Sequence, residues 1–334
     1  MNTAIDLFSG CGGLTLGLKG AGFDVLAAVE VNSKAVETYR ANHPDVLLYS
    51  EDVRKLDPAD IMRELGICPG DLSLLAGCPP CQGFSRLRTK NKDKFPCDDR
   101  NDLIYDFLRF VEILRPKLLM LENVPALALD RRFSEFVDRI SFLGYKFSFK
   151  IVNAADYGVP QRRRRLIFMG SMTSTPSFPE PVERRTVRMA IGDLDCSALD
   201  SGDIHFIPER RSESVRRLIA LIPKDGGSRD FLPDDMVLKC HKKFDGFRDV
   251  YGRMSWDDVS PTITSGCSNP SKGRFLHPEE DRTITLREAA ILQGFPIDYK
   301  FLSHHGKESV ALMIGNALPP PLIEIHARGL FIAG

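Results

Sequence analysis

The stretch TAIDLFSGCGG, residues 3–13, decides the fold because a short apolar run ends abruptly in glycines. The run has the length of a strand, and the apolar spacing of residues 14–22 is helical. Glycines at a strand-to-helix turn let the backbone approach a ligand, and the helix N-terminus favours an anionic group. Thr15 stands where the dinucleotide-binding fingerprint has its last glycine, so this stretch alone is a weak cofactor signal.

The alternation of strand-like runs and helical patterns continues through the first half of the chain. Further strand-like runs occupy residues 23–31, 72–80, 117–124 and 164–171, and helical patterns occupy residues 32–43 and 102–116. This alternation favours βαβ units, so we predict an α/β protein with a doubly wound, mainly parallel sheet. Functional residues of such sheets lie in the loops at the carboxyl ends of the strands.

The texture of the sequence changes at residues 171–185, where Pro, Ser and Thr cluster. Regular periodicity fades until about residue 285, and helical patterning returns in residues 286–296 and 308–334. We therefore predict a catalytic and cofactor-binding domain at residues 1–178 and a smaller irregular domain at residues 179–286. Residues 287–334 are predicted to complete the first domain.

The composition excludes several classes of protein. Basic and acidic residues number 45 each among 334 residues, and 43% of the residues are apolar, which is enough for a core. No apolar run approaches the ~20 residues that span a bilayer, and the N-terminus lacks the features of a signal peptide. Eight cysteines without the density of a disulfide scaffold fit a reducing compartment. We expect a cytoplasmic protein rather than a secreted, membrane or fibrous one.

Two acidic residues follow strand-like runs in positions suited to a nucleoside. Glu30 lies 20 residues past Gly10 at the end of a predicted strand, where an acid binds ribose hydroxyls. Asp52 ends the apolar run of residues 45–52 in a comparable place and suits an adenine amino group. With the glycine turn, these acids predict an adenosine-containing ligand, either NAD or S-adenosylmethionine.

Two cysteines follow the strand-like run of residues 72–80. Cys78 and Cys81 form a C-x-x-C pair, but the chain has no second pair for a zinc site. The two prolines between them do not begin the helix that a thioredoxin-like nucleophile needs. Cys78 is interpreted as a buried structural residue, whose replacement with alanine should retain activity. Cys81 lies between a rigid Pro-Pro turn and a basic loop, which presents its thiol to a cleft.

A carboxylate and two basic segments complete the candidate site. Glu122 terminates a strand-like run and points into the same crevice as Cys81. Because side chains alternate along a strand, Gln161, Arg163 and Arg165 would share one face of the next run. Residues 82–94 carry five basic residues and one acidic residue, although such a run alone is more often a solvated surface.

The ordered set of motifs resembles that of bacterial DNA (cytosine-5)-methyltransferases over nearly the whole chain. The set comprises DLFSGCGG (6–13), Glu30, Asp52, GCPPCQGFS (77–85), LENV (121–124), PQRRRRL (160–166), SPTIT (260–264), LREAAILQGFP (286–296) and IGNALPPPL (314–322). Each motif is weak alone, whereas the ordered set is specific. Cys78 departs from the family pattern, in which glycine or phenylalanine is frequent, and IGNAL replaces the commoner GNAV.

The resemblance implies a fold and a covalent mechanism. It implies the Rossmann-like fold of S-adenosylmethionine-dependent methyltransferases, with residues 179–286 as the target-recognition domain. Cys81 would add to C6 of a flipped cytosine in a specific duplex sequence, so that C5 can attack the sulfonium methyl group. Glu122 would hold N3 and the amino group and protonate N3. Arg165 would contact O2, and Arg163 would help to set the electrostatics of the site.

The resemblance also implies ligand contacts and partners. The residues expected to line the S-adenosylmethionine pocket are Phe8, Gly10, Gly12, Glu30, Asp52, Pro80 and Asn316. The DNA-binding residues expected on the basic loop are Gln82, Ser85, Arg86, Arg88 and Lys90. Double-stranded DNA is the expected partner of a monomeric, nucleoid-associated enzyme that releases S-adenosylhomocysteine and uses no metal. A cognate restriction endonuclease would act separately.

Three alternatives use parts of the same evidence. A tRNA cytosine-5 methyltransferase shares the scaffold, but its Cys-Phe-Thr signature is missing from this sequence. An inactive S-adenosylmethionine-binding DNA regulator would not need Cys81, Glu122, Arg163 and Arg165 together. An NAD oxidoreductase is disfavoured by Thr15 and by the Pro-Pro-Cys site.

Overall fold

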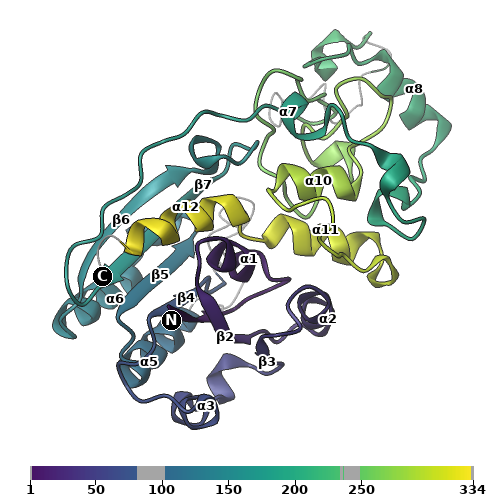
Figure 1. Cartoon of the computed structure of the whole chain (residues 1–334). Coiled ribbons are helices and arrows are strands. Elements are labelled where there is room, and N and C mark those ends of the chain that lie inside the picture. Colours follow the sequence, from purple (N-terminus) through teal and green to yellow (C-terminus); the bar gives the residue numbers. More distant parts are fainter. Residues whose placement is uncertain (1, 81–101, 234–235, 237–248, 332–334) are drawn as a thin grey trace, which may run out of the picture. The chain divides into compact units, whose positions relative to one another are not determined.

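The chain forms two compact units, shown in a computed structural model that describes residues 2–80, 102–233, 236 and 249–331 (Figure 1). The sheet unit comprises Met1–Asn153, Arg164–Pro181 and Leu318–Gly334. The irregular unit comprises Ala154–Arg163 and Val182–Ala317. None of the helices in the described ranges is both long and apolar enough to cross a membrane.

The sheet unit is built on seven strands. They are β1 (Thr3–Leu7), β2 (Asp24–Val29), β3 (Leu47–Tyr49), β4 (Leu74–Gly77), β5 (Leu118–Asn123), β6 (Lys146–Asn153) and β7 (Arg164–Ser171). Their order in the sheet is β3-β2-β1-β4-β5-β7-β6. The pairs among β1 to β5 are parallel, whereas β7 runs antiparallel to β5 and to β6. The predicted doubly wound, mainly parallel sheet is confirmed.

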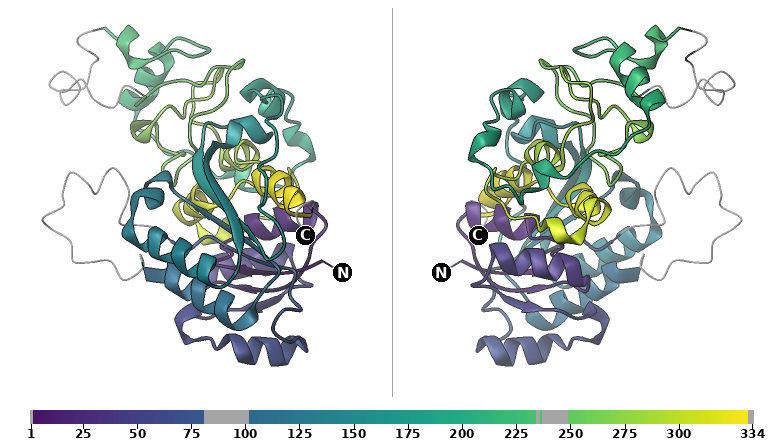
Figure 2. Two further views of the ribbon diagram at one scale, coloured as in Figure 1. Left: turned by 90° about the vertical axis from the view of Figure 1, so that its left-hand side faces the viewer. Right: turned by 90° about the vertical axis from the view of Figure 1, so that its right-hand side faces the viewer.

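Helices cover both faces of this sheet, which the views in Figures 1 and 2 show from different sides. They are α1 (Gly13–Gly20), α2 (Ser33–Asn42), α3 (Pro58–Leu65), α5 (Leu103–Leu114), α6 (Arg131–Phe142) and α12 (Pro320–Phe331). Buried side chains of α3, α5 and α6 join those of the strands in one apolar cluster. Within this cluster the rings of Phe107, Phe136 and Phe168 pack edge to face, 6.1 Å apart for the first pair and 5.1 Å for the second.

The C-terminal helix α12 packs against α1 at the beginning of the chain. Gly17 makes this contact possible, because a Cβ atom at that position would lie 2.6 Å from the Cβ of Ile323 and 2.6 Å from the carbonyl oxygen of Pro320. The two helix backbones therefore approach more closely than any larger residue would allow. The last segment of the chain thus belongs to the same core as the first strand.

The irregular unit contains short helices joined by turns. Its helices are α7 (Val187–Ile191), α8 (Glu213–Leu221), α10 (Leu286–Leu292) and α11 (Lys307–Asn316). Short 3-10 helices occur in the described part of both units. They are Val53–Lys55 and Pro125–Leu129 in the sheet unit, and Ala154–Tyr157, Cys196–Ala198, Ile204–Phe206, Arg229–Phe231, Pro270–Lys272 and Ser303–His305 in the irregular unit. Strand pairing in the described part of this unit is limited to isolated bridges. The predicted loss of regular periodicity after residue 178 agrees with this structure.

In the irregular unit, a buried arginine donates hydrogen bonds to backbone carbonyl groups that strand pairing would satisfy in a sheet. Arg253 is fully buried and donates five hydrogen bonds. Two of them, 3.0 and 2.9 Å long, reach the carbonyl oxygens of Ile219 and Ile222 at the C-terminal end of α8. Two others reach the carbonyl oxygens of His277 and Glu280. A guanidinium group with its fixed fork of donors thus caps a helix and fastens a turn to it.

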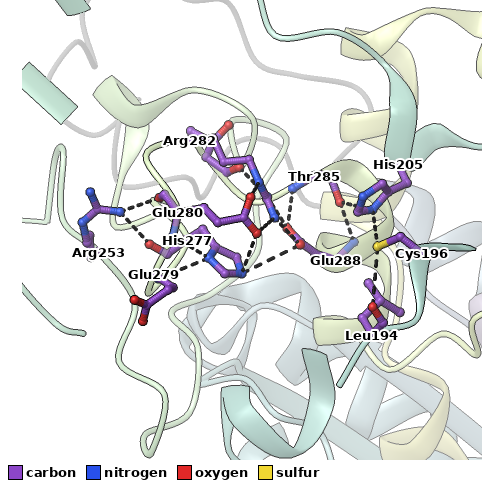
Figure 3. Close-up of polar contacts among 11 residues, drawn as sticks. Leu194, Cys196, His205, Arg253, His277, Glu279, Glu280, Arg282, Thr285 and Glu288 are labelled. Carbon is purple, nitrogen blue, oxygen red and sulfur yellow. Dashed lines mark hydrogen bonds and ion pairs between the residues drawn. The ribbon is translucent and has the colours of Figure 1, made fainter. Parts of the chain in front are cut away.

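The turn that Arg253 fastens carries a further ionic network (Figure 3). Arg282 lies 2.8 Å from carboxylate oxygens of both Glu280 and Glu288. Glu288 also completes a capping box with Thr285 at the start of α10. The Nδ1 atom of His277 accepts hydrogen bonds from two backbone N–H groups, and burial lowers the pKa of this histidine. These contacts fix an irregular path without strands.

The two compact units do not divide the chain where sequence texture changes. The sequence pattern changes at residues 179 and 287, whereas the irregular unit takes in Ala154–Arg163 and then runs from Val182 to Ala317. Helices α10 and α11 are therefore part of the irregular unit, and α12 is part of the sheet unit. The functional division into catalytic and target-recognition domains stays a prediction.

Candidate active site

Two neighbouring parallel strands end side by side at the candidate site. β4 pairs with β5 with Gly77 opposite Leu121, so Cys78 and Glu122 come next at the same edge. The Cys78 thiol donates a hydrogen bond to Oε2 of Glu122, with 2.9 Å between sulfur and oxygen. The Nδ2 atom of Asn123 donates to the carbonyl oxygen of Pro79 at 2.9 Å. The LENV strand end is thereby fastened to the Cys-Pro-Pro turn by two adjacent side chains.

The carboxylate of Glu122 is paired with Arg165 of the neighbouring strand β7. Glu122 lies opposite Ile167, and Arg165 is two residues away on the same face of the sheet. Its Nε atom lies 2.8 Å from Oε1 of Glu122, and the two side chains are 16% and 3% exposed. Among the described residues, Oε1 accepts no hydrogen bond despite this ion pair. The site therefore holds a dry, charge-paired carboxylate with an oxygen open to a new donor.

Gln161 and Arg163 belong to the irregular unit, because β7 begins at Arg164. The strand alternation used to place them on one face with Arg165 therefore does not extend to them. Arg163 is 2% exposed, and its guanidinium donates to the carbonyl oxygens of Ile263, Gly315 and Ala317 at 3.1, 3.1 and 3.2 Å. The catalytic role of Arg163 stays a prediction.

Gln161 belongs to the same buried polar network. Its Nε2 atom donates to Oε1 of Gln293 at 2.6 Å, and its own Oε1 accepts from the backbone N–H of Ile263 at 2.9 Å. Gln293 in turn donates to the carbonyl oxygen of Ala317. Through this network, residues of the PQRRRRL, SPTIT, LREAAILQGFP and IGNALPPPL motifs are in contact within the irregular unit.

The glycine turn after β1 is tied to the end of β2. Phe8, Gly10 and Gly12 have φ angles of 63°, 57° and 98°, so the turn is left-handed at three points. Glu30 accepts hydrogen bonds from the backbone N–H groups of Gly10 at 2.8 Å and of Asn32 at 2.7 Å. Burial raises the pKa of this carboxyl group, and the two N–H groups oppose that rise. The side chain of Glu30 thereby fastens the backbone of the glycine turn to the end of β2.

Thr15 has a structural reason to replace the last glycine of the dinucleotide fingerprint. Its hydroxyl donates to Oδ2 of Asp6 at 2.7 Å and lies 2.8 Å from the hydroxyl of Tyr39. Asp6 is fully buried, and desolvation raises its pKa to about 8. A glycine would leave this buried carboxyl group without its hydroxyl partner. The departure from the fingerprint therefore reflects the packing beneath the turn.

The remaining predicted cofactor residues lie in three places. Asp52 follows β3, and both of its oxygens accept from Arg54, which holds its pKa down at about 2. Pro80 is partly buried after β4, and Asn316 is the exposed last residue of α11 in the irregular unit. A Cβ atom at Gly10 would meet no atom within 4 Å, so the turn borders open space. Acidic strand ends around an open glycine turn fit an adenosine-containing ligand.

Several predicted residues lie outside the described part of the chain. They are the nucleophile Cys81 and the DNA-binding residues Gln82, Ser85, Arg86, Arg88 and Lys90. Conversely, sequence reasoning missed the contact between Cys78 and Glu122. The available signal was the departure of Cys78 from the glycine or phenylalanine of the family pattern. The contact of Asn123 with Pro79 carried no such signal.

Comparisons with known proteins agree with this arrangement. The family model described as C-5 cytosine-specific DNA methylase matches residues 2–331. The chain is 34% identical to the type II methylase M.HgiDII of Herpetosiphon aurantiacus over 99% of this chain and 95% of the relative. It is 35% identical to the type II methyltransferase M1.HphI of Haemophilus parahaemolyticus, over 98% and 86% of the two chains.

A solved structure is similar over the full length of the chain. It is described as a putative DNA modification methyltransferase encoded within a prophage of E. coli. The TM-score is 0.68 at 28% identity, over 100% of this chain and 99% of the other. Spodoptera frugiperda DNMT2, with a TM-score of 0.64 at 18% identity over 99% and 100% of the two chains, shares the fold.

Fold and site together define an S-adenosylmethionine-dependent methyltransferase. More narrowly, the chain belongs to the C-5 cytosine-specific DNA methylase family, and it is a DNA (cytosine-5)-methyltransferase. The NAD oxidoreductase is excluded by this membership. The tRNA methyltransferase is disfavoured, because the bacterial relatives are named as type II methylases.

Proposed function

We propose that Cys81, Glu122 and Arg165 methylate a flipped cytosine through a covalent adduct. The Cys81 thiolate adds to C6 while Glu122 donates a proton to N3, which makes C5 nucleophilic. Arg165 contacts O2 of the base. After C5 has taken the methyl group, a base removes the C5 proton, N3 returns its proton to Glu122 and Cys81 is eliminated as thiolate. Arg163 would help to set the electrostatics of the site, and this role rests on the resemblance alone.

The observation that carries this proposal is the environment of Glu122. A carboxylate that is 3% exposed is costly to charge unless it is paired, and Arg165 at 2.8 Å supplies the pairing. Its Oε1 atom accepts no hydrogen bond from the described residues, so it has lone pairs for a ligand. A flipped cytosine offers a protonated N3 and an amino group as donors, which match such an acceptor.

The glycine turn and the acidic strand ends are the proposed binding residues for the methyl donor. S-adenosylmethionine supplies an electrophilic methyl group when it is bound. Phe8, Gly10 and Gly12 would present backbone to it, and Glu30 and Asp52 would accept from its hydroxyl and amino groups. Pro80 and Asn316 are assigned by the resemblance alone. The proposed chemistry needs no metal ion, because thiolate addition and protonation at N3 activate the carbon.

The proposed partner is a specific sequence in duplex DNA. Residues 179–286 would read the sequence, and the basic loop with Gln82, Ser85, Arg86, Arg88 and Lys90 would contact the phosphates. We propose that the enzyme acts as a monomer in the cytoplasm, associated with the nucleoid. A cognate restriction endonuclease acting separately would complete a restriction–modification system.

The decisive experiment compares the parent enzyme with Cys81→Ser. Bisulfite sequencing of DNA from a host that expresses the parent should show methylated cytosines in one sequence context, and the serine variant should give none. DNA that contains 5-fluorocytosine should trap a covalent adduct with the parent only. Substantial methylation by Cys81→Ser would overturn the assignment of the nucleophile.

A further inference from the structure

Cys78 is held in a fixed position beside the site. It is a partly buried cysteine directly after β4. Its backbone N–H donates to the carbonyl oxygen of Leu7 at 3.3 Å, which extends the pairing of β4 with β1. The next residue, Pro79, is held through its carbonyl oxygen by Asn123 at 2.9 Å. The backbone on both sides of the thiol is therefore fastened to the sheet.

The thiol and Arg165 hold the two oxygens of Glu122 separately. The Sγ atom of Cys78 lies 2.9 Å from Oε2, and the Nε atom of Arg165 lies 2.8 Å from Oε1. The terminal torsion of a glutamate is broad, so one partner alone leaves the carboxylate free to rotate about its last bond. Two partners on opposite oxygens fix the plane of the carboxylate. They also fix where its remaining lone pairs point.

We propose that Cys78 is a positioning residue, whose thiol holds the carboxylate of Glu122 in the orientation that serves the flipped cytosine. The inference rests on the proposed role of Glu122 in protonating N3. A carboxylate has about four acceptor positions, so Oε2 keeps the thiol while other lone pairs receive the base. Because the thiol acts on orientation, it affects the methylation step more than DNA affinity.

The first test is the single-turnover rate of methylation at saturating DNA and S-adenosylmethionine. Cys78→Ala should lower this rate by about 3- to 10-fold, the scale of one orienting hydrogen bond. The contact with Glu122 thereby replaces the expectation from the sequence that this variant keeps its full activity. Its DNA dissociation constant should stay within about twofold, because the base contacts remain. Cys78→Ser restores a donor at the same place and should recover the parent rate within about twofold. Cys68→Ala, at an exposed free cysteine, is the matched control.

A double-mutant cycle shows whether Cys78 acts through Glu122. Glu122→Gln should be slow by about 10²-fold or more, the scale of a positioned general acid. Adding Cys78→Ala to this variant should cost no more than about twofold, since the carboxylate that the thiol orients is gone.

The outcomes separate the inference from the proposed function. A parent-like rate for Cys78→Ala beside a slow Glu122→Gln overturns the inference alone. An equal loss from Cys78→Ala in both backgrounds also overturns it, because the thiol would then act independently of Glu122. A parent-like rate for Glu122→Gln overturns the proposed role of Glu122, and the inference with it.

Discussion

The sheet unit and the irregular unit satisfy their buried polar groups in opposite ways. In the sheet unit, strand pairing satisfies the backbone, and polar side chains at strand ends keep open positions. Within the described ranges, Oδ1 of Asp6, inside β1, and Oε1 of Glu122, near the end of β5, are buried acceptors without a hydrogen bond. In the irregular unit, buried guanidinium groups donate to backbone carbonyls, as Arg253 does to Ile219 and Ile222.

This difference separates residues that hold the protein together from residues that are available for chemistry. A sheet needs no side chain to satisfy its ladder, so the carboxylate of Glu122 can be removed without freeing backbone groups of the paired strands. An irregular chain has no ladder, and each buried carbonyl depends on an individual donor. Charged residues should therefore matter for catalysis in the sheet unit and for folding in the irregular unit.

The largest expected effect is the loss of stability in Arg253→Ala. This fully buried side chain donates to four carbonyl oxygens and to the carboxylate of Asp281, and each of these acceptors would lose that hydrogen bond. The Asp281 carboxylate keeps Lys224, and the carbonyl oxygens of Ile219 and Glu280 keep backbone donors. Hydrogen bonds from a charged donor are worth about 1.5–3 kcal/mol each, so the loss of several of them should cost about 3 kcal/mol or more.

The only tryptophan of the chain provides the readout for this variant. Trp256 belongs to the irregular unit, and its ring packs against His277, next to the turn that Arg253 fastens. Urea unfolding followed by tryptophan fluorescence should show the loss in the free energy of unfolding. A loss below about 1 kcal/mol, the value of a single ordinary hydrogen bond, would break the comparison.

A pH-dependent effect is expected at Asp6 in the sheet unit. Its pKa is about 8 in the folded protein against an ordinary 3.8, because burial penalises the charged form. Between these values the folded protein holds a proton that the unfolded chain has lost, so stability falls as pH rises through this window. Asp6→Asn removes the titrating group and should flatten this dependence.

Between pH 5 and pH 8, the free energy of unfolding of the parent should fall by an amount on the order of 3 kcal/mol. Each unit of pKa shift corresponds to about 1.4 kcal/mol, and relaxation of the structure around a buried charge reduces the total. Urea unfolding of parent and variant, followed by circular dichroism at pH 5 and pH 8, isolates Asp6, because the other titrating groups are common to both. Parallel pH dependences in the two proteins would show that Asp6 is charged in the folded state, and would contradict the assignment of an open, protonated acid there.

The sheet was predictable where apolar runs are local and bounded by glycine or proline. β1, β2, β4, β5 and β7 coincide with such runs. The parallel order of the first four follows from the helices between them, whereas β7 is antiparallel to β5. β6 was not predicted, because Lys146–Asn153 is an edge strand that exposes much of its length and interrupts its apolar residues with lysines. An edge strand of this kind has a pattern close to that of a surface loop.

The site was predictable only for residues that belong to short motifs. Glu122 and the glycine turn were found because each closes a strand. The partners of Arg163 lie 100 to 154 residues away in the chain, so no local pattern indicates them. The contact of Cys78 with Glu122 depends on the register of β4 and β5, which spacing along the sequence does not specify.

The smallest expected effect is that of replacing an exposed arginine, which tests whether burial explains the effect of Arg253→Ala. Arg217 lies on α8, the helix whose end Arg253 caps, and pairs with Glu213 at 3.1 Å, but its side chain is 73% exposed. Water solvates this guanidinium in the folded and unfolded chains alike, and no backbone carbonyl depends on it.

Arg217→Ala should therefore change the free energy of unfolding by no more than about 0.5 kcal/mol, the value of an exposed i,i+4 pair. Urea unfolding of Arg217→Ala is followed by the same tryptophan fluorescence as that of Arg253→Ala. A loss above about 1 kcal/mol in the free energy of unfolding would show that arginine content rather than buried hydrogen bonding stabilises this unit. A negligible loss beside a large one for Arg253→Ala attributes the difference to burial, since both residues are arginines and both are in contact with α8.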